Sequence, residues 1–146
     1  MTINGHYQLF DYLDSRDRNV MQGWASDFDE EQRGRLDLRI EVLERAKVGE
    51  DLPPKLLTPT SGKPRQRHIL EMPMKGQVAL RPMLCRGPID MGGEFTFLDG
   101  AVERDRKYVP LDAPRRAEAN RQDLIERGEI GRENHKRFNI QGERSF

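Results

Sequence analysis

Apolar residues fall into a few short groups along the chain, and polar or charged segments separate them. The clearest group lies in residues 29–51, where Leu36, Ile40 and Leu43 recur at i, i+4 and i+7. This spacing predicts an amphipathic helix, because it places the three side chains on one helical face. Acidic residues at its start suit the helix dipole, and Gly49 is a suitable end.

Two further helices are predicted, one before and one after the central part of the chain. Residues 16–28 form a short helical segment whose apolar residues include Trp24. In the second half, Asp112 stands at an N-cap position, Pro114 follows in the first turn, and Gly128 is placed to end a helix. These signals predict a C-terminal helix between Asp112 and Gly128.

Runs of apolar residues with turn signals between them predict the strands. Residues 5–15 fit either an extended or a helical pattern, and we favour a strand. Three more strands are predicted at 67–74, 77–86 and 93–104. The Lys75-Gly76 link is a hairpin signal, and Pro82 predicts a bulge or an edge strand. The segment before them, 51–65, contains four prolines and predicts a loop whose leucines anchor it to the core.

The order of these elements is strand, helix, helix, three strands and helix. It predicts an α+β fold with a small antiparallel sheet of about four strands, covered on one side by two N-terminal helices and one C-terminal helix. We expect residues 1–130 to form a single domain, since one core is usual at this chain length. Residues 131–146 combine glycines with scattered charge, which predicts a polar, flexible C-terminal tail.

The composition limits the size of the core and the class of partner. Hydrophobic residues make up 35% of the 146 residues and charged residues 34%, so the apolar residues must concentrate in a few elements. The net charge is zero, but the first 62 residues carry 8 Lys/Arg and 12 Asp/Glu, and the rest carry 17 and 13. Binding to a polyanion would therefore need a local basic face in the second half. Because no apolar run predicts a signal peptide or a membrane span, we expect a cytoplasmic protein without a membrane partner.

Residue spacing argues against a metal centre and against cofactor chemistry. His6, His68, His135 and Cys85 do not fall at the short spacings that bring metal ligands together on one element, so no metal is expected. The glycine-rich motifs that bind nucleotides are missing from the sequence, so no cofactor is expected either. We interpret Cys85 as a small buried hydrophobe in a strand rather than a nucleophile.

Cations gather near the predicted strands and the last helix, and they are the strongest candidates for function. They are Lys63, Arg65, Arg67, Arg81, Arg86, Arg104, Arg106, Lys107, Arg115 and Arg116. If these side chains line one concave surface, their fixed charges would bind phosphates and stabilise a phosphorane. The alternative is that Arg104, Arg106 and Lys107 alternate with Glu103 and Asp105 in a solvated turn, which is the commoner role of such runs.

Three short segments resemble one family of proteins in their order and in several residues. "HILEMPM" contains Glu71, and "VALRPML" contains Arg81. "FLDGAVERDRKYVPLDAP" supplies Leu98, Gly100, Val102, Arg104 and Pro110. With the helices before and after them, these segments make residues 36–125 resemble the RelE/ParE superfamily of toxins, in particular its HigB-like, phage-derived branch. Asp99 and Glu103 stand where that family has a histidine and a lysine.

The resemblance implies a toxin of a toxin–antitoxin pair, a metal-independent endonuclease that cleaves mRNA on the ribosome. An antitoxin of the helix-turn-helix type is the implied protein partner. The resemblance makes Arg81, Arg104 and Lys107 the candidate catalytic residues. Together with the charge pattern it makes a second group the candidate nucleic-acid ligands, namely Lys63, Arg65, Arg67, Arg86, Arg106, Tyr108, Arg115 and Arg116. Two alternatives remain. One is a non-catalytic protein on the same scaffold, such as a host-protein or gyrase-type inhibitor, and the other is an unrelated phage or mobile-element interaction protein.

Overall fold

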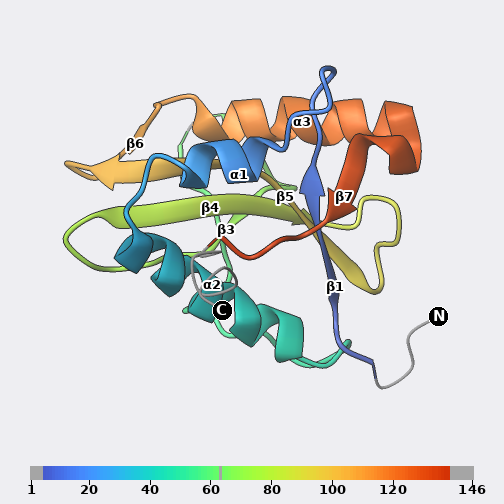
Figure 1. Ribbon diagram of the computed structural model, residues 1–146, viewed down its shortest axis with the longest axis horizontal. Helices are drawn as coiled ribbons and strands as arrows, with labels where there is room; N and C mark the ends of the chain where they lie inside the picture. The colour runs from blue at the N-terminus through green and yellow to red at the C-terminus, as the bar shows by residue number, and fades with distance from the viewer. Residues whose placement is uncertain (1–4, 63, 139–146) are drawn as a thin grey trace, which may run out of the picture.

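The computed structural model describes residues 5–62 and 64–138, which fold around a mixed β-sheet (Figure 1). Its strands are β1 (Gln8–Tyr12), β2 (Thr58–Pro59), β3 (Leu70–Glu71), β4 (Ala79–Arg86), β5 (Glu94–Arg104), β6 (Lys107–Val109) and β7 (Arg132–Asn134). Its helices are α1 (Val20–Ala25), α2 (Glu30–Arg45) and α3 (Ala113–Arg127), and a 3₁₀ turn covers Gly128–Gly131. In this part of the chain no helix has the length and apolar character needed to cross a membrane.

The strand order is β2-β3-β4-β5-β1-β7, with β6 added to the end of β5. The α+β class is confirmed, but the prediction of about four antiparallel strands is wrong, because the sheet has seven strands and β1 runs parallel to β5. The strands that the sequence missed are β2, β6 and β7, each of two or three residues. Such short strands contain too few alternating positions to be recognised by pattern.

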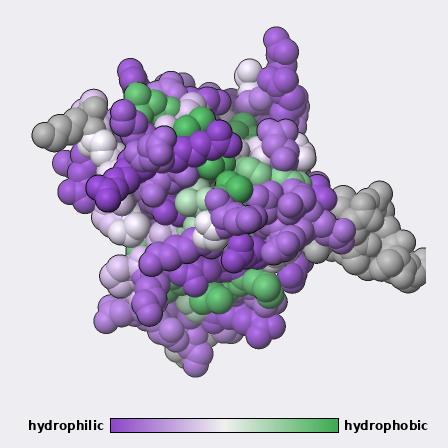
Figure 2. Space-filling view, turned by 90° about the vertical axis from the view of Figure 1, so that its left-hand side faces the viewer, coloured by the Kyte–Doolittle hydropathy of each residue, from purple (hydrophilic) through white to green (hydrophobic). Residues whose placement is uncertain are grey.

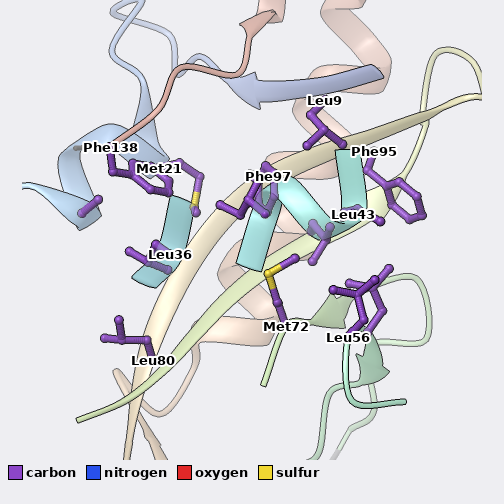
Figure 3. Packing of buried hydrophobic residues seen from close by; sticks show 14 of the residues in the cluster. Leu9, Met21, Leu36, Leu43, Leu56, Met72, Leu80, Phe95, Phe97 and Phe138 are labelled. Carbon is purple, nitrogen blue, oxygen red and sulfur yellow. The ribbon is translucent and has the colours of Figure 1, made fainter. Parts of the chain in front are cut away.

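The helices cover both faces of the sheet, which corrects the prediction of a one-sided arrangement (Figure 1). On one face, α1 and α2 bury Met21, Leu36 and Leu43 against strand residues that include Phe97 (Figure 3). On the other face, α3 packs against a second cluster that contains Leu98. Phe97 and Leu98 are consecutive, and a strand turns consecutive side chains to opposite faces, so β5 serves both layers.

Local signals set the ends of the two long helices. Asp29 caps α2 through a capping box, in which its carboxylate accepts from the Gln32 N–H at 2.8 Å and the Gln32 amide oxygen accepts from the Asp29 N–H at 3.1 Å. Asp112 occupies the N-cap position of α3, although its side chain makes no capping hydrogen bond. Gly128 ends α3 with a φ of 73°, a conformation that favours glycine.

The prediction for the middle of the chain is partly confirmed. Strand β4 contains Pro82 and lies between β3 and β5, with a register shift after Met83. The proline therefore marks a bulge rather than an edge strand. The strand predicted at 67–74 shrinks to the two residues of β3. The proline-rich loop is anchored as expected, since Leu56 and Leu57 are buried in the core.

The end of the described chain belongs to the fold, so the prediction of a tail from residue 131 is wrong for residues 131–138. Strand β7 pairs antiparallel with β1, and Phe138 is buried. A polar sequence predicts exposure, so this strand was not expected. Arg132 is nevertheless enclosed, because it pairs with Glu94 and lies 3.7 Å from the centroid of the Phe10 ring. The rest of the predicted tail, residues 139–146, lies outside the described residues.

Candidate nucleic-acid interface

The first candidate site is a pocket of about 390 Å³ between the β5–β6 hairpin, the loop before β3 and the start of α3. We call it the Tyr108 pocket. It is lined by Ser61, Gly62, Pro64, Gln66, Glu103, Arg106, Lys107, Tyr108, Leu111, Asp112, Pro114 and Arg115. Three lining residues are cations and two are acids, so the pocket has an excess of positive charge. The N-terminal end of α3 adds a partial positive charge at the same place.

A tight hairpin brings two of the cations to this pocket. Asp105 and Arg106 form the two-residue link between β5 and β6, and both have left-handed backbone conformations, with φ of 52° and 65°. Links of this kind favour asparagine and glycine, so an arginine there carries a conformational cost on the order of 1 kcal/mol. The charged run predicted either as a solvated turn or as the edge of a site is therefore a turn that also contributes Arg106 and Lys107 to a pocket.

The floor of the pocket is a buried polar network. The Tyr108 hydroxyl donates to Glu71, and the Ser61 N–H donates to the Tyr108 oxygen at 2.9 Å. The Glu71 carboxylate also forms an ion pair with Arg81, with 3.0 Å between Arg81 Nε and Glu71 Oε2. Tyr108 thus stands between the pocket and a buried carboxylate.

Arg81 does not line the Tyr108 pocket, and its side chain is only 10% exposed. Its guanidinium also lies 3.4 Å from the Glu103 carboxylate and donates to the Met74 carbonyl at 2.8 Å. Two carboxylates therefore face its single charge. The structure places this residue, the first of the candidate catalytic cations, as the centre of a buried ion-pair network rather than at the surface of the pocket.

Burial changes the proton affinity of the network. Burial raises the pKa of Glu71, although the Tyr108 hydrogen bond and the Arg81 charge oppose it. Burial also raises the pKa of Tyr108, and its hydrogen bond to Glu71 adds to the effect. A raised pKa makes the Glu71 carboxylate a stronger base and the Tyr108 hydroxyl a weaker acid, so the tyrosine keeps its proton in this network and donates it in the hydrogen bond to Glu71.

A second, smaller pocket of about 170 Å³ is also lined in part by the loop before β3, and we call it the Arg86 pocket. It is lined by Arg67, His68, Leu70, Arg86, Met91 and Arg121. Its lining contains three arginines and no acid. Arg121 itself is paired with Glu118 at 3.2 Å. Phosphate oxygens suit such a lining, because arginine offers several fixed donors.

The two pockets share their supporting elements. The loop that contributes Gln66 to the Tyr108 pocket contributes Arg67 to the Arg86 pocket. Helix α3 contributes Arg115 to the first and Arg121 to the second, positions about 9 Å apart along the helix axis at 1.5 Å per residue. A polyanion that follows this loop could contact both pockets.

The structure thus brings part of the predicted set together. Arg106, Lys107, Tyr108 and Arg115 share the Tyr108 pocket, and Arg67 and Arg86 share the Arg86 pocket. Four predicted residues lie elsewhere: Arg104 and Arg65 are exposed outside both linings, Arg116 pairs with Asp99 at 3.5 Å, and Arg81 lines neither pocket. Lys63 lies outside the described residues.

Sequence reasoning missed several contributors to these pockets. Ser61, Gln66 and Arg121 line them without having been singled out. Arg121 lies on the same predicted helix as Arg115, but a spacing of six residues does not place two side chains on one helical face. Ser61 and Gln66 carried no signal, since only the folded loop brings them to Tyr108.

Cys85 and the histidines take no part in a metal site among the described residues. The interpretation of Cys85 as a buried hydrophobe is confirmed, because the residue is fully buried and burial raises the pKa of its thiol to about 12. The thiolate that a nucleophile requires is therefore strongly disfavoured. Comparison of the chain with protein-family models, with curated proteins and with solved structures found no match.

Proposed function

We propose that the chain is a RelE/HigB-like toxin that cleaves mRNA on the ribosome without a metal ion, and that an antitoxin protein holds it inactive. The observation that carries the proposal is that Arg106, Lys107 and Arg115 line one pocket together with Tyr108, whose hydroxyl donates to the buried Glu71 carboxylate. Cations and a proton acceptor at one site are groups that promote phosphodiester cleavage by a ribose 2′-OH. The Arg86 pocket would hold a neighbouring phosphate of the same RNA strand.

The network suggests how the proton moves. The ribose 2′-oxygen attacks phosphorus and forms a new bond, while the bond from phosphorus to the 5′-oxygen breaks. The 2′-OH passes its proton to the Tyr108 oxygen as the Tyr108 proton moves to Glu71. The ribose hydroxyl takes the place of the Ser61 hydroxyl, which lies 3.3 Å from the Tyr108 oxygen. The departing 5′-oxygen takes a proton from water, and the hydroxide that forms is neutralised by the proton that Glu71 then releases. The products are a 2′,3′-cyclic phosphate and a 5′-hydroxyl, and Glu71 is again a carboxylate.

The cations stabilise charge, and the remaining residues orient the reacting groups. Arg106, Lys107 and Arg115 face the phosphorane as its negative charge develops. Arg81 is a positioning residue in this scheme, because it touches Glu71 and Glu103 and holds the first as a carboxylate. The family resemblance implied that Arg81 contacts the phosphate. In this scheme Arg81 instead holds Glu71, the residue that accepts the proton.

A second candidate is a non-catalytic protein on the same scaffold that binds a protein or RNA partner. Two observations favour it. Glu103 and Asp112 line the Tyr108 pocket and would repel a phosphate, and the charge of Arg81 is already balanced by carboxylates. The experiment that tests the proposal must therefore separate binding from cleavage.

The test is induction of the chain in bacteria, with mapping of mRNA 5′ ends, and incubation of the purified protein with mRNA in the presence and absence of ribosomes. We expect growth arrest and codon-phased cuts that need ribosomes and persist in EDTA. The double variant Lys107→Ala/Arg115→Ala should lower the cleavage rate by about 100-fold or more, since each cation stabilises the transition state. Tyr108→Phe should abolish cleavage and leave RNA binding in place.

Arg16→Ala is the matched control, because Arg16 is an exposed arginine on the turn before α1 and lines neither pocket. It should cleave at the original rate. Harmless expression of a folded protein, or cleavage that the pocket variants leave unchanged, would contradict the proposal. RNA or protein binding without cleavage would support the second candidate. Growth restored by the product of a neighbouring helix-turn-helix gene would support the antitoxin partner.

A further inference from the structure

A groove of about 600 Å³ runs along the outer side of α2, on the layer of the molecule away from α3. We call it the α2 groove. It is lined by Arg35, Leu38, Arg39, Val42, Lys55, Pro73, Met74, Lys75 and Arg81. Leu38 is 62% exposed and Val42 53% exposed, although both are aliphatic residues of a helix whose other apolar side chains are buried. Figure 2 shows green apolar surface low on its face, at the height of α2 in Figure 1, with purple hydrophilic atoms above and below it.

Contacts across the groove hold its walls in place. The Arg39 guanidinium on α2 donates to the Lys55 carbonyl of the proline-rich loop. The Arg81 guanidinium donates to the Met74 carbonyl at 2.8 Å and fixes the opposite wall. At one end Arg35 lies against Gly76, where an added Cβ would approach the guanidinium to 2.5 Å. The groove is therefore formed before any ligand binds, which lowers the entropy cost of binding.

The chemistry of the lining points to one class of ligand. Its apolar part is aliphatic, made by Leu38, Val42, Pro73 and Met74. Its remaining residues are cations, and no acid lines the groove. Arg81 is balanced by its own carboxylates, so the unbalanced positive charge comes from Arg35, Arg39, Lys55 and Lys75. Leu38 and Val42 are one helical turn apart, a spacing that fits apolar side chains arranged at i and i+4 on a partner helix.

We propose that the α2 groove binds an acidic amphipathic helix of a partner protein. The aliphatic stripe of that helix packs on Leu38 and Val42, and its carboxylates face the cationic rim. Nucleic acid fits less well, because bases bind by stacking on aromatic side chains and the groove offers none. A second copy of this chain fits less well too, since a two-fold interface would set this cationic rim against itself. The proposal is independent of the RNA chemistry of the Tyr108 pocket.

The test uses two synthetic helical peptides of about 18 residues, labelled with a fluorophore, and anisotropy with the full-length protein. The first peptide carries leucines at i, i+4, i+7 and i+11 with glutamates beside them, and the second has lysines in place of the glutamates. We expect the acidic peptide to bind at least tenfold more tightly than the basic one, and its affinity to fall as salt rises.

Variants in the groove separate its apolar and charged contributions. Leu38→Ser/Val42→Ser should weaken binding of the acidic peptide by about tenfold or more, because it removes the apolar contact. Lys75→Glu should weaken it several-fold and reduce the salt dependence. Ile130→Ser is the matched control, since Ile130 is 74% exposed and lies outside the groove, and it should bind as the original protein does. All of these positions are exposed, so the variants should fold, which circular dichroism checks.

Three results would overturn the proposal. The first is equal binding of the acidic and basic peptides, or binding that the groove variants leave unchanged. The second is a dimer in sedimentation that Leu38→Ser/Val42→Ser dissolves, which would make a second copy the occupant. The third is binding to vesicles of phosphatidylserine that the same variant abolishes while the peptide fails to bind, which would make the groove a lipid contact.

Discussion

Two clusters of buried ionisable side chains lie in different parts of the sheet, and they differ in what surrounds them. The first joins Arg81 and Glu71 to Tyr108, which faces the Tyr108 pocket. The second joins Asp11 on β1 to His135 just after β7, with 2.8 Å between the carboxylate and Nδ1. Both clusters are buried, and each pairs opposite or complementary groups.

The second cluster is enclosed by other side chains. Asp11 is fully buried and also accepts from the Asn19 amide at 2.9 Å. The His135 ring lies against Phe97 and Phe138, with centroid distances of 5.1 Å to each. Neither Asp11 nor His135 lines the Tyr108 pocket or the Arg86 pocket. Burial of ionisable groups is therefore a poor sign of function by itself, and contact with a pocket is what distinguishes the Tyr108 network.

The largest expected effect follows from removal of Arg81. Arg81→Ala leaves Glu71 buried beside Glu103 without their shared cation, so we expect the free energy of unfolding to fall by about 3–5 kcal/mol. Urea denaturation measures this change. The double variant Arg81→Met/Glu71→Gln should recover most of the loss, because it removes both charges together. A loss below about 1 kcal/mol in the single variant would show that Arg81 is not held as the ion pairs indicate.

The next effect concerns the enclosed cluster. His135→Phe keeps an aromatic ring between its neighbours but removes the partner of the buried Asp11 carboxylate, so stability should fall by about 2 kcal/mol. Urea denaturation again gives the measurement. Cleavage or RNA binding per folded molecule should stay unchanged, in contrast to Tyr108→Phe. Loss of RNA cleavage or binding in the folded His135→Phe protein would contradict the view that only the Tyr108 network takes part in function.

The smallest effect is a difference in pH dependence. The pKa of Glu71 is raised above the value of 4.5 that an unperturbed glutamate has, so the folded state binds this proton more tightly than the unfolded state. The resulting contribution to stability is complete below about pH 4.5 and is lost as pH rises through the folded pKa. Unfolding of the original protein and of Glu71→Gln, compared between pH 4 and 8, should show this decline in the original protein alone. Parallel curves would contradict the raised pKa.

Short-range signals in the sequence were enough to predict much of the framework. Helix α2 follows from the spacing of Leu36, Ile40 and Leu43, and α3 from Pro114 and Gly128, because helix hydrogen bonds and caps join residues close together in the chain. The α+β class and the three central strands follow in the same way. For the candidate site, the charge run after β5 indicated Arg106 and Lys107, and the family resemblance indicated Arg81. Glu71 matched the family motif, but no role in the site was predicted for it.

Other features depend on residues far apart in the chain. The parallel pairing of β1 with β5 joins Gln8 to Glu94, and β7 becomes a strand because β1 offers it an edge. Polar sequence patterns predict exposure, yet Arg132 and Asp11 are enclosed, since Glu94 and His135 supply their partners. Pattern-based reasoning counts a charge as exposed unless its partner is known.

The helices, the central strands and the presence of a cationic run are thus properties of local sequence, because nearby residues supply the hydrogen bonds and caps. The folded chain alone determines where each cation lies. It buries Arg81 between carboxylates, leaves Arg104 outside both pockets, and brings Arg115 into one pocket with Lys107 and Tyr108. The physical reason is that the effect of a charged side chain depends on its burial and on the charges near it. For these cations, that environment forms only when the loop before β3, the β5–β6 hairpin and α3 pack together.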